Sequence, residues 1–283
     1  MIHCVITWNP DPVMFHIGNM SIRWYSVLLG VGFFTGYLFA RFIFKKEGVD
    51  RIVLESYGIW LLIGILVGGR LGHCLFYEFD YYIQHPLEII KPWSGTLGKD
   101  AVFTGLSGFS SHGWTIGIIL TLWLNSRIRK VPVLWALDIF AIVVVLAGAF
   151  VRIGNLMNSE IVGSPSELPW AFIFPRVDQI ARHPAQIYES LAYLFTFILV
   201  FRYYTRKMRT VPNGTYLGWV MVGVFLSRFL IEFIKRDQVA YEAGMSINLG
   251  QYLSIPFILS GLFFIYRKAL YGWLRNRKLK RES

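Results

Sequence analysis

Seven long apolar runs constrain this chain more than any other feature of its sequence. Most of them approach the roughly 20 residues that an α-helix needs to cross the hydrocarbon core of a bilayer, and the fifth is short. Only 16% of the 283 residues are charged, whereas soluble domains carry about 25%. The runs lie at residues 22–44, 52–76, 106–124, 131–151, 188–201, 216–234 and 249–266. The sequence therefore predicts an all-α, polytopic integral membrane protein with about seven transmembrane helices.

The basic residues predict how these helices are oriented. The net charge of +11 would by itself also fit a nucleic-acid-binding protein. However, lysines and arginines cluster after the first, third, fifth and seventh runs, which alternation places on one side of the membrane. The positive-inside rule makes that side cytoplasmic. We therefore expect one membrane-embedded domain over residues 1–283 and no nucleic-acid partner. Its amino terminus is expected to be periplasmic, with periplasmic loops at 77–105 and 152–187 and a basic cytoplasmic tail at 267–283.

Other sequence signals are weak or missing. The first residues lack the basic start and the small-residue cleavage pattern of a signal peptide, so the first run is expected to remain in the mature protein. Two cysteines, Cys4 and Cys74, are too few for a disulfide framework. The six histidines are scattered, without H-x-x-x-H or C-x-x-C spacing, so we expect no metal site and no cofactor.

A polar motif stands at the outer end of the fourth run. Residues 152–163 read R-I-G-N-L-M-N-S-E-I-V-G. Charged and amide groups are costly at that depth, so they usually face a cavity in the protein. Alternatively, Arg152 is an ordinary interfacial cap that extends to lipid phosphates. The candidate ligands in this motif are Arg152, Asn155, Asn158, Glu160 and Gly163.

Further polar side chains occur inside the other runs. His112 and Arg228 both lie roughly 18–19 Å above the cytoplasmic boundary, at 1.5 Å per residue. Arg228 and Glu232 are four residues apart, so they share one helical face and can pair. Arg70 lies nearer the outer surface, and Tyr25 is either an interfacial anchor or a donor to an anion. The imidazole of His112 could act as a base near pH 7 or only join two helices by hydrogen bonds.

A second group of residues is expected to support the site. The stretch R-H-P-A-Q-I-Y-E at 182–189 contributes His183, Gln186, Tyr188 and Glu189, and the last run contributes Gln251. Taken together, the residues predict an anion-binding cavity that opens toward the outer leaflet and holds one possible base. Chemistry on a phosphate-bearing lipid fits this pattern best. The main alternative is a membrane transporter or binding protein for anionic lipid or phosphate compounds, although we see no pair of similar halves with interrupted helices.

Several motifs together resemble the prolipoprotein diacylglyceryl transferase family. They are S-H-G-x-x-I-G at 111–117, the motif at 152–163, R-H-P-x-Q-x-Y-E at 182–189 and R-F-x-x-E-F at 228–233. G-G-R-L-G at 68–72 and L-G-Q-Y-L-S-I-P at 249–256 fit as well. The resemblance covers residues 22–261. The chain departs from the family at Trp114, where a second glycine is usual, and in a longer segment at 93–112.

The resemblance implies a seven-helix enzyme of the bacterial inner membrane that functions as a monomer. It would transfer the diacylglyceryl group of phosphatidylglycerol to the lipobox cysteine thiol of preprolipoprotein signal peptides, forming a thioether and releasing glycerol 1-phosphate. This is the first step of lipoprotein maturation. Arg152 would bind the lipid headgroup and Arg228 the departing phosphate. His112 would accept the thiol proton or orient the lipid, and both roles remain open at this point.

Overall fold

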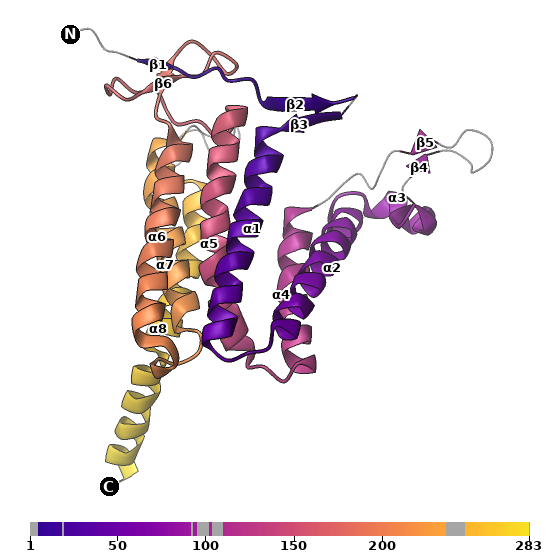
Figure 1. The fold of residues 1–283 in the computed structure, drawn as a ribbon. Coiled ribbons are helices and arrows are strands. Elements are labelled where there is room, and N and C mark those ends of the chain that lie inside the picture. The colour runs from indigo at the N-terminus through magenta and orange to yellow at the C-terminus, as the bar shows by residue number, and fades with distance from the viewer. Residues whose placement is uncertain are drawn as a thin grey trace. The chain divides into compact units, whose positions relative to one another are not determined.

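The computed structural model of the chain describes residues 5–18, 20–91, 93–94, 102–103, 110–235 and 247–282. The protein is mostly helical, at 73%. Its α-helices are α1 (Trp24–Lys46), α2 (Arg51–Phe76), α3 (Phe79–Gln84), α4 (Ser111–Ile128), α5 (Val133–Asn158), α6 (Ala185–Lys207), α7 (Thr215–Ile231) and α8 (Leu249–Glu282), as Figure 1 shows. Single-turn 3-10 helices are η1 (Pro86–Ile89), η2 (Met208–Thr210) and η3 (Glu232–Ile234).

Each of the seven predicted apolar runs coincides with one long helix. Within the described ranges, five helices are long and apolar enough to cross a membrane: α1, α2, α5, α7 with its extension η3, and α8. The structure thus confirms a mainly α-helical integral membrane protein. The role of α4 and α6 as two further spans stays a prediction.

Two helix boundaries differ from the prediction. Helix α5 continues to Asn158, seven residues beyond the predicted end of the fourth run. Helix α6 begins directly after Pro184, so the segment between the two helices is 159–184 instead of the predicted loop at 152–187. The start of the third run, 106–109, lies outside the described residues, and α4 begins at Ser111. Arg152 and Asn155 therefore project from a helix and not from a loop.

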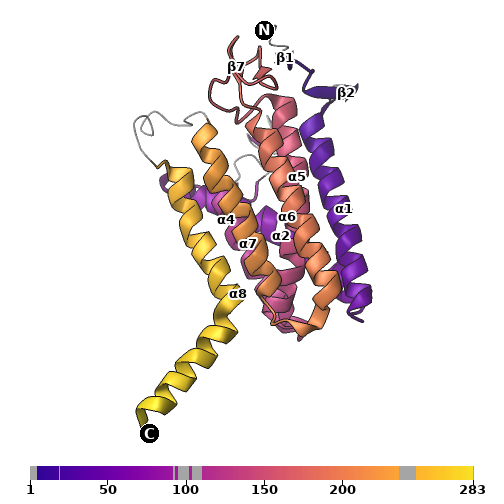
Figure 2. The ribbon, with the colours of Figure 1, turned by 90° about the vertical axis from the view of Figure 1, so that its left-hand side faces the viewer.

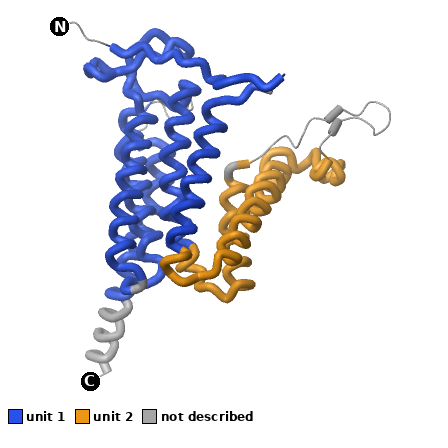
Figure 3. The backbone as a smooth tube through the Cα atoms, viewed as in Figure 1, with its two compact units in different colours: residues 1–43, 137–283 blue, residues 44–136 orange. Residues whose placement is uncertain are grey.

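The chain forms two compact units (Figure 3). Unit 1 comprises residues 1–43 and 137–283, and unit 2 comprises residues 44–136. In unit 1, α7 runs between α6 and α8 (Figure 2). At one end of these helices, β1 (Ile6–Thr7) pairs in parallel with β6 (Phe172–Ile173), and β6 pairs antiparallel with β7 (Ala181–Arg182). A hairpin of β2 (Val13–Ile17) and β3 (Met20–Arg23) leads directly into α1.

A buried carboxylate fixes the start of α7 in unit 1. Asp138 of α5 is only 3% exposed. Its Oδ2 accepts a hydrogen bond from the Gly214 backbone N–H (2.5 Å), and its Oδ1 accepts one from Leu217 (2.7 Å). Gly214 precedes α7 with a φ of 93°, which an L side chain rarely adopts. These bonds satisfy two N–H groups that a helix start leaves unpaired, and they fix the position of α7 along α5.

Unit 2 is built on a close contact between α2 and α4. Gly64, Gly68 and Gly72 of α2 face Gly113 and Gly117 of α4. A Cβ placed at Gly72 would lie 2.5 Å from the Cα of Gly113, which real Cβ atoms essentially never do. Small residues of this kind allow membrane helices to approach until their backbones touch. Two short β-strands, β4 (Trp93–Ser94) and β5 (Val102–Phe103), also belong to this unit.

Candidate active site

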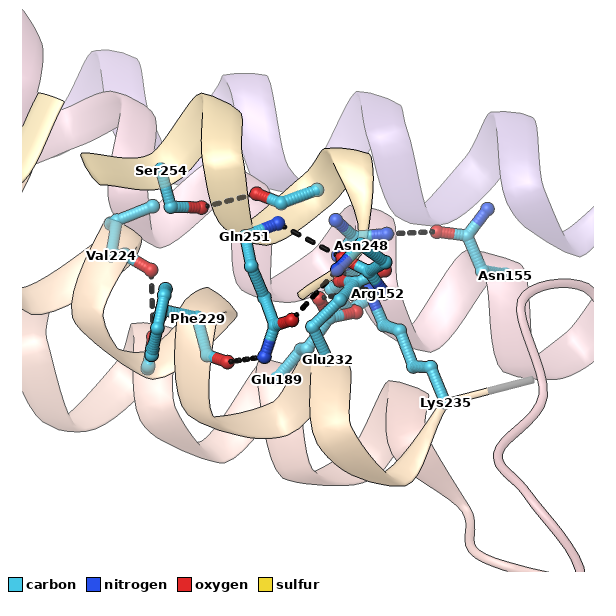
Figure 4. Close-up of polar contacts among 12 residues, drawn as sticks. Arg152, Asn155, Glu189, Val224, Phe229, Glu232, Lys235, Asn248, Gln251 and Ser254 are labelled. Carbon is cyan, nitrogen blue, oxygen red and sulfur yellow. Dashed lines mark hydrogen bonds and ion pairs between the residues drawn. The ribbon is translucent and has the colours of Figure 1, made fainter. Parts of the chain in front are cut away.

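A fully buried carboxylate lies at the centre of the polar residues of unit 1. Glu189 of α6 is 0% exposed. Its Oε2 lies 3.0 Å from Nε of Arg152, and its Oε1 lies 2.9 Å from Nζ of Lys235. The same Lys235 ammonium lies 3.0 Å from Oε2 of Glu232. Figure 4 shows these four side chains gathered between α5, α6, the end of α7 and α8. Two buried cations are therefore balanced by two buried carboxylates.

Lys235 was not among the residues predicted from the sequence. Its side chain reaches Glu189 and Glu232 because the backbone at 163–164 pairs with residues 234–235. Gly163 forms a bridge with Lys235, and Ser164 N–H donates to the Ile234 carbonyl at 2.9 Å. A side chain at Gly163 would lie 2.5 Å from Cβ of His183, so the last position of the motif must be glycine. The sequence signal for Lys235 is its i, i+3 spacing from Glu232.

The motif after Arg152 forms its own hydrogen-bonded group. Asn155 Nδ2 donates to Glu160 Oε2 at 3.0 Å, and Asn158 Nδ2 donates to Oε1 of the same carboxylate at 3.1 Å. Arg152 Nη1 lies 3.5 Å from Asn155 Oδ1. Gln186 of α6 donates to the Glu160 backbone carbonyl at 2.5 Å. Glu160 is itself exposed, so its carboxylate is both held in place and accessible.

The backbone on each side of Glu160 is in an unusual conformation. Ser159 and Ile161 both have a φ of 57°. This left-handed region is rare for residues other than glycine, and it is a true outlier for a β-branched residue. Such a conformation costs on the order of 1–3 kcal/mol, and it is concentrated at functional sites. The strain therefore marks the Glu160 segment as a part of the chain that the surrounding structure holds in place.

Tyr25 and Gln251 also lie close to the network. Tyr25 of α1 packs on Gly154, where an added Cβ would lie 2.8 Å from the tyrosine ring. Gln251 of α8 donates to the Phe229 carbonyl at 3.2 Å, which ties α8 to α7. Next to it, Gly250 leaves room for the Glu232 carboxylate. These contacts bring α1, α7 and α8 to the arginine of α5.

His183 and Tyr188 form a second small group near Gly163. Tyr188 OH accepts a hydrogen bond from Trp170 Nε1 at 2.9 Å and lies 3.3 Å from His183 Nδ1. Partial burial lowers the pKa of His183 below its usual value, so its imidazole is neutral at pH 7. The His183 Nδ1 and the Tyr188 hydroxyl are within hydrogen-bonding distance, and the histidine tautomer decides which of them donates. This arrangement supports the loop that carries Gly163.

A comparison with known proteins identifies the family. A family model for prolipoprotein diacylglyceryl transferase matches residues 12–267. The chain belongs to this family. A curated relative from Bacteroides fragilis, named phosphatidylglycerol--prolipoprotein diacylglyceryl transferase, is 39% identical over 92% of this chain and 94% of its own. Relatives with the same name from Tolumonas auensis and Porphyromonas gingivalis are each 38% identical, over 94% and 93% of this chain and 98% and 94% of their own.

Arg228 differs from the expected arrangement in this member of the family. The sequence predicted that it pairs with Glu232, but Glu232 pairs with Lys235. Within the described part of the chain, the Arg228 side chain has no ion pair or hydrogen bond. The 3-10 turn η3 begins at Glu232, and Lys235 N–H donates to the Glu232 carbonyl at 3.2 Å, which brings the lysine next to that carboxylate. Among the described residues, Arg152 is thus held by Glu189, whereas Glu232 pairs with Lys235 and not with Arg228.

Arg70 and His112 of this family member lie in unit 2. Arg70 donates from Nε to the Ile89 carbonyl (2.8 Å) and from Nη2 to the Glu88 carbonyl (2.7 Å), and its guanidinium lies 5.0 Å from the Tyr82 ring centroid. These contacts position the segment after α2, and the part of Arg70 in binding an anionic lipid stays a prediction. His112 is exposed on the first turn of α4. Because His112 and Arg152 belong to different units, a shared site stays a prediction.

The titratable residues of the described chain offer no obvious metal centre. Among these residues, no three His, Cys, Asp or Glu side chains lie together in a way that could hold a metal ion. The site described above offers guanidinium groups, side-chain amides and the Glu160 carboxylate, which can accept hydrogen bonds from hydroxyl groups. Guanidinium groups are well suited to phosphate oxygens because their planar fork meets two of them at once.

Proposed function

We propose that this chain is a phosphatidylglycerol–prolipoprotein diacylglyceryl transferase of the bacterial inner membrane. It transfers the diacylglyceryl group to the thiol of a lipobox cysteine in a preprolipoprotein and releases glycerol 1-phosphate. Seven helices span the membrane, with a periplasmic amino terminus and a cytoplasmic carboxyl terminus. The chain works as a monomer and forms one catalytic domain. The observation that carries the proposal is the inward-facing Arg152, which Glu189 holds beside the hydroxyl-binding group of Asn155 and Glu160.

The reaction needs a nucleophile and a stabilised leaving group. A cysteine thiol has a pKa near 8.5, so most of it is protonated at pH 7, and the thiolate is the reactive form. The sulfur attacks the diacylglyceryl carbon bonded to the phosphate ester oxygen. A carbon–sulfur bond forms, the carbon–oxygen bond breaks, and its electron pair stays on the phosphate. The phosphodiester, with one negative charge, becomes a phosphomonoester with two. Groups that meet this new charge lower the barrier.

Arg152 and Arg228 take different parts in this reaction. Arg152 is oriented before the lipid binds, because its Nε is held by Glu189. It therefore serves the headgroup phosphate, with Asn155, Asn158, Glu160 and Gly163 around the headgroup glycerol. Arg228, whose guanidinium can meet two phosphate oxygens at once, takes the charge that develops on the departing phosphate. Tyr25 donates to the lipid, and Glu232 is held by Lys235.

We assign the thiol proton to His112, because an imidazole is the side chain that most often accepts a proton near neutral pH. The supporting residues are those that hold the arginine and the motif in place. Glu189 and Gln186 contact Arg152 and the Glu160 backbone directly. His183, Tyr188 and Gln251 act one step further away, through the Gly163 loop and helix α8.

The experiment is lipidation of a lipobox peptide by the purified protein in detergent with phosphatidylglycerol. We expect a peptide whose mass increases by one diacylglyceryl group and equimolar release of glycerol phosphate. A matched peptide with serine in place of the lipobox cysteine should stay unmodified. If a folded preparation binds phosphatidylglycerol but gives no thioether product, the chain is a transporter or binding protein for anionic lipid, and the proposal fails.

A further inference from the structure

The last turn of α5 is held by groups that lie far away in the chain. The helix ends with Ser159 N–H donating to the Leu156 carbonyl (3.0 Å) and Glu160 N–H to the Asn155 carbonyl (2.9 Å). This is the pattern of a Schellman motif, in which glycine usually occupies the left-handed position. Here that position is Ser159, with a φ of 57°. Since the local sequence does not favour this helix end, other contacts must stabilise it.

One of these contacts comes from the amino-terminal segment. The indole Nε1 of Trp8 donates to the Leu156 carbonyl at 2.9 Å. The backbone N–H of Trp8 donates to the Ile173 carbonyl at 2.8 Å, which continues the pairing of β1 with β6. The Trp8 ring lies 5.6 Å from that of Phe172, against a buried cluster that also includes Leu156 and Phe174. The strand, the ring packing and the hydrogen bond therefore fix one geometry.

A second contact reaches the same turn from the loop after β6. Arg176 Nη2 donates to the Met157 carbonyl at 3.2 Å and also to the carbonyl of Pro10. One guanidinium nitrogen thus links the amino-terminal segment to the end of α5. The last carbonyls of a helix have no partner within the helix. Arg176 supplies a partner for the Met157 carbonyl, and Trp8 adds a second donor to the Leu156 carbonyl, which already accepts from Ser159 N–H.

We propose that Trp8 and Arg176 are positioning residues for the lipid headgroup site, because they hold the end of α5 through the Leu156 and Met157 carbonyls. Neither side chain is bonded to Arg152, Asn155 or Glu160 in the contacts above, so both act through the backbone. The proposal rests on the proposed function for its readout of turnover. It gives the short amino-terminal strand a role in substrate recognition that is separate from anchoring α1.

The test is a comparison of Trp8→Phe and Arg176→Lys with the unchanged protein. Trp8→Phe keeps an aromatic ring and removes only the N–H donor. We expect the KM for phosphatidylglycerol to rise roughly 3- to 10-fold, as for the loss of one hydrogen bond, while the KM for the lipobox peptide stays unchanged. Trp219→Phe is the matched control, since Trp219 is 41% exposed on α7. It should behave like the unchanged protein.

A double-mutant cycle with Asn155→Ala separates positioning from general stability. If Trp8 acts through the motif, Trp8→Phe should have little further effect on the KM for phosphatidylglycerol once Asn155 is alanine. If Trp8→Phe and Asn155→Ala instead raise the KM for phosphatidylglycerol independently, so that their effects multiply, the proposal is wrong. It is also wrong if Trp8→Phe and Arg176→Lys both fail to fold. The dissociation constant for phosphatidylglycerol is measured alongside. If the unchanged protein gives no thioether, the proposed function fails. The double-mutant cycle can then be repeated with the dissociation constant for phosphatidylglycerol in place of KM, and it still decides whether Trp8 positions the site.

Discussion

Replacing Glu189 with glutamine tests the buried charge network directly. The substitution keeps the size of the side chain and removes its charge. The unchanged network holds two cations, Arg152 and Lys235, and two carboxylates, Glu189 and Glu232, at distances of 2.9–3.0 Å. In Glu189→Gln the same buried space holds two cations and one carboxylate. One cation is left without a partner, and Glu232 contacts only Lys235.

The size of the effect follows from the burial of these groups. Removing one partner of a buried ion pair typically costs about 3–5 kcal/mol, because the other charge remains desolvated. For a chain longer than 150 residues, about 1 kcal/mol changes the melting temperature by roughly 2–4 °C. We therefore expect Glu189→Gln to melt roughly 6–20 °C below the unchanged protein. Activity should also fall, because the Arg152 Nε loses the carboxylate that orients it.

Thermal unfolding in detergent, followed by tryptophan fluorescence, measures the change in melting temperature. Lipidation of the lipobox peptide measures the change in activity. Glu167→Gln is the matched control, since Glu167 is an exposed glutamate in the loop before β6. In the double variant Glu189→Gln/Lys235→Met the buried charges again balance, so part of the lost stability should return. A melting temperature within 2 °C of the unchanged protein for Glu189→Gln would refute the central role of this carboxylate.

Four further predictions concern single groups. Arg152→Lys keeps the charge but loses the planar fork, so kcat/KM should fall on the order of 10²-fold; near-normal turnover would make Arg152 an interfacial cap. His112→Gln should lower the rate about 10²–10⁴-fold if it removes the base, and the deficit should shrink from pH 7 to 9 because the peptide supplies more thiolate; a deficit that does not change with pH would leave His112 as a lipid-binding residue. Asp138→Ala leaves two buried N–H groups unpaired at about 1–3 kcal/mol each, so its melting temperature should fall, and an unchanged value would contradict the cap described for α7. A reporter fused after Arg209 should be cytoplasmic and one near Ser166 periplasmic; the reverse would overturn the assigned orientation.

Hydropathy predicted the helices well because each apolar run must be covered by lipid or protein. It placed the end of α5 too early, since the polar residues after 151 continue the helix. Hydropathy reads those residues as the start of a loop. Their side chains instead bond to α6 and to one another inside unit 1. The usual signal for a helix end, a glycine at the left-handed position, is also missing because Ser159 occupies it.

The sequence identified most of the polar residues that meet in unit 1, but it did not predict which of them form ion pairs. The sequence assigned Glu189 a supporting role, which stays a prediction, and it did not indicate that the carboxylate contacts Arg152. Lys235 was missed because it follows the last apolar run, where a lysine looks like an ordinary solvated residue. The spacing of Arg228 and Glu232 suggested a pair, but the choice of Lys235 as partner depends on the turn η3 and on backbone pairing with Gly163. Such pairings arise from tertiary contacts that spacing cannot show.

The glycine contact between α2 and α4 has a consequence for comparing sequences within the family. Every single-base change in a glycine codon that gives another amino acid adds at least a Cβ. At Gly72 and Gly68 that atom would lie within about 2.5 Å of the backbone of α4. Purifying selection should therefore keep these positions as glycine whatever substrate the enzyme uses. Between them lies Arg70, bonded to the carbonyls that follow α3. Glycines kept at positions 68 and 72 in an alignment would thus report helix packing, and they should not be counted as a sign of catalysis.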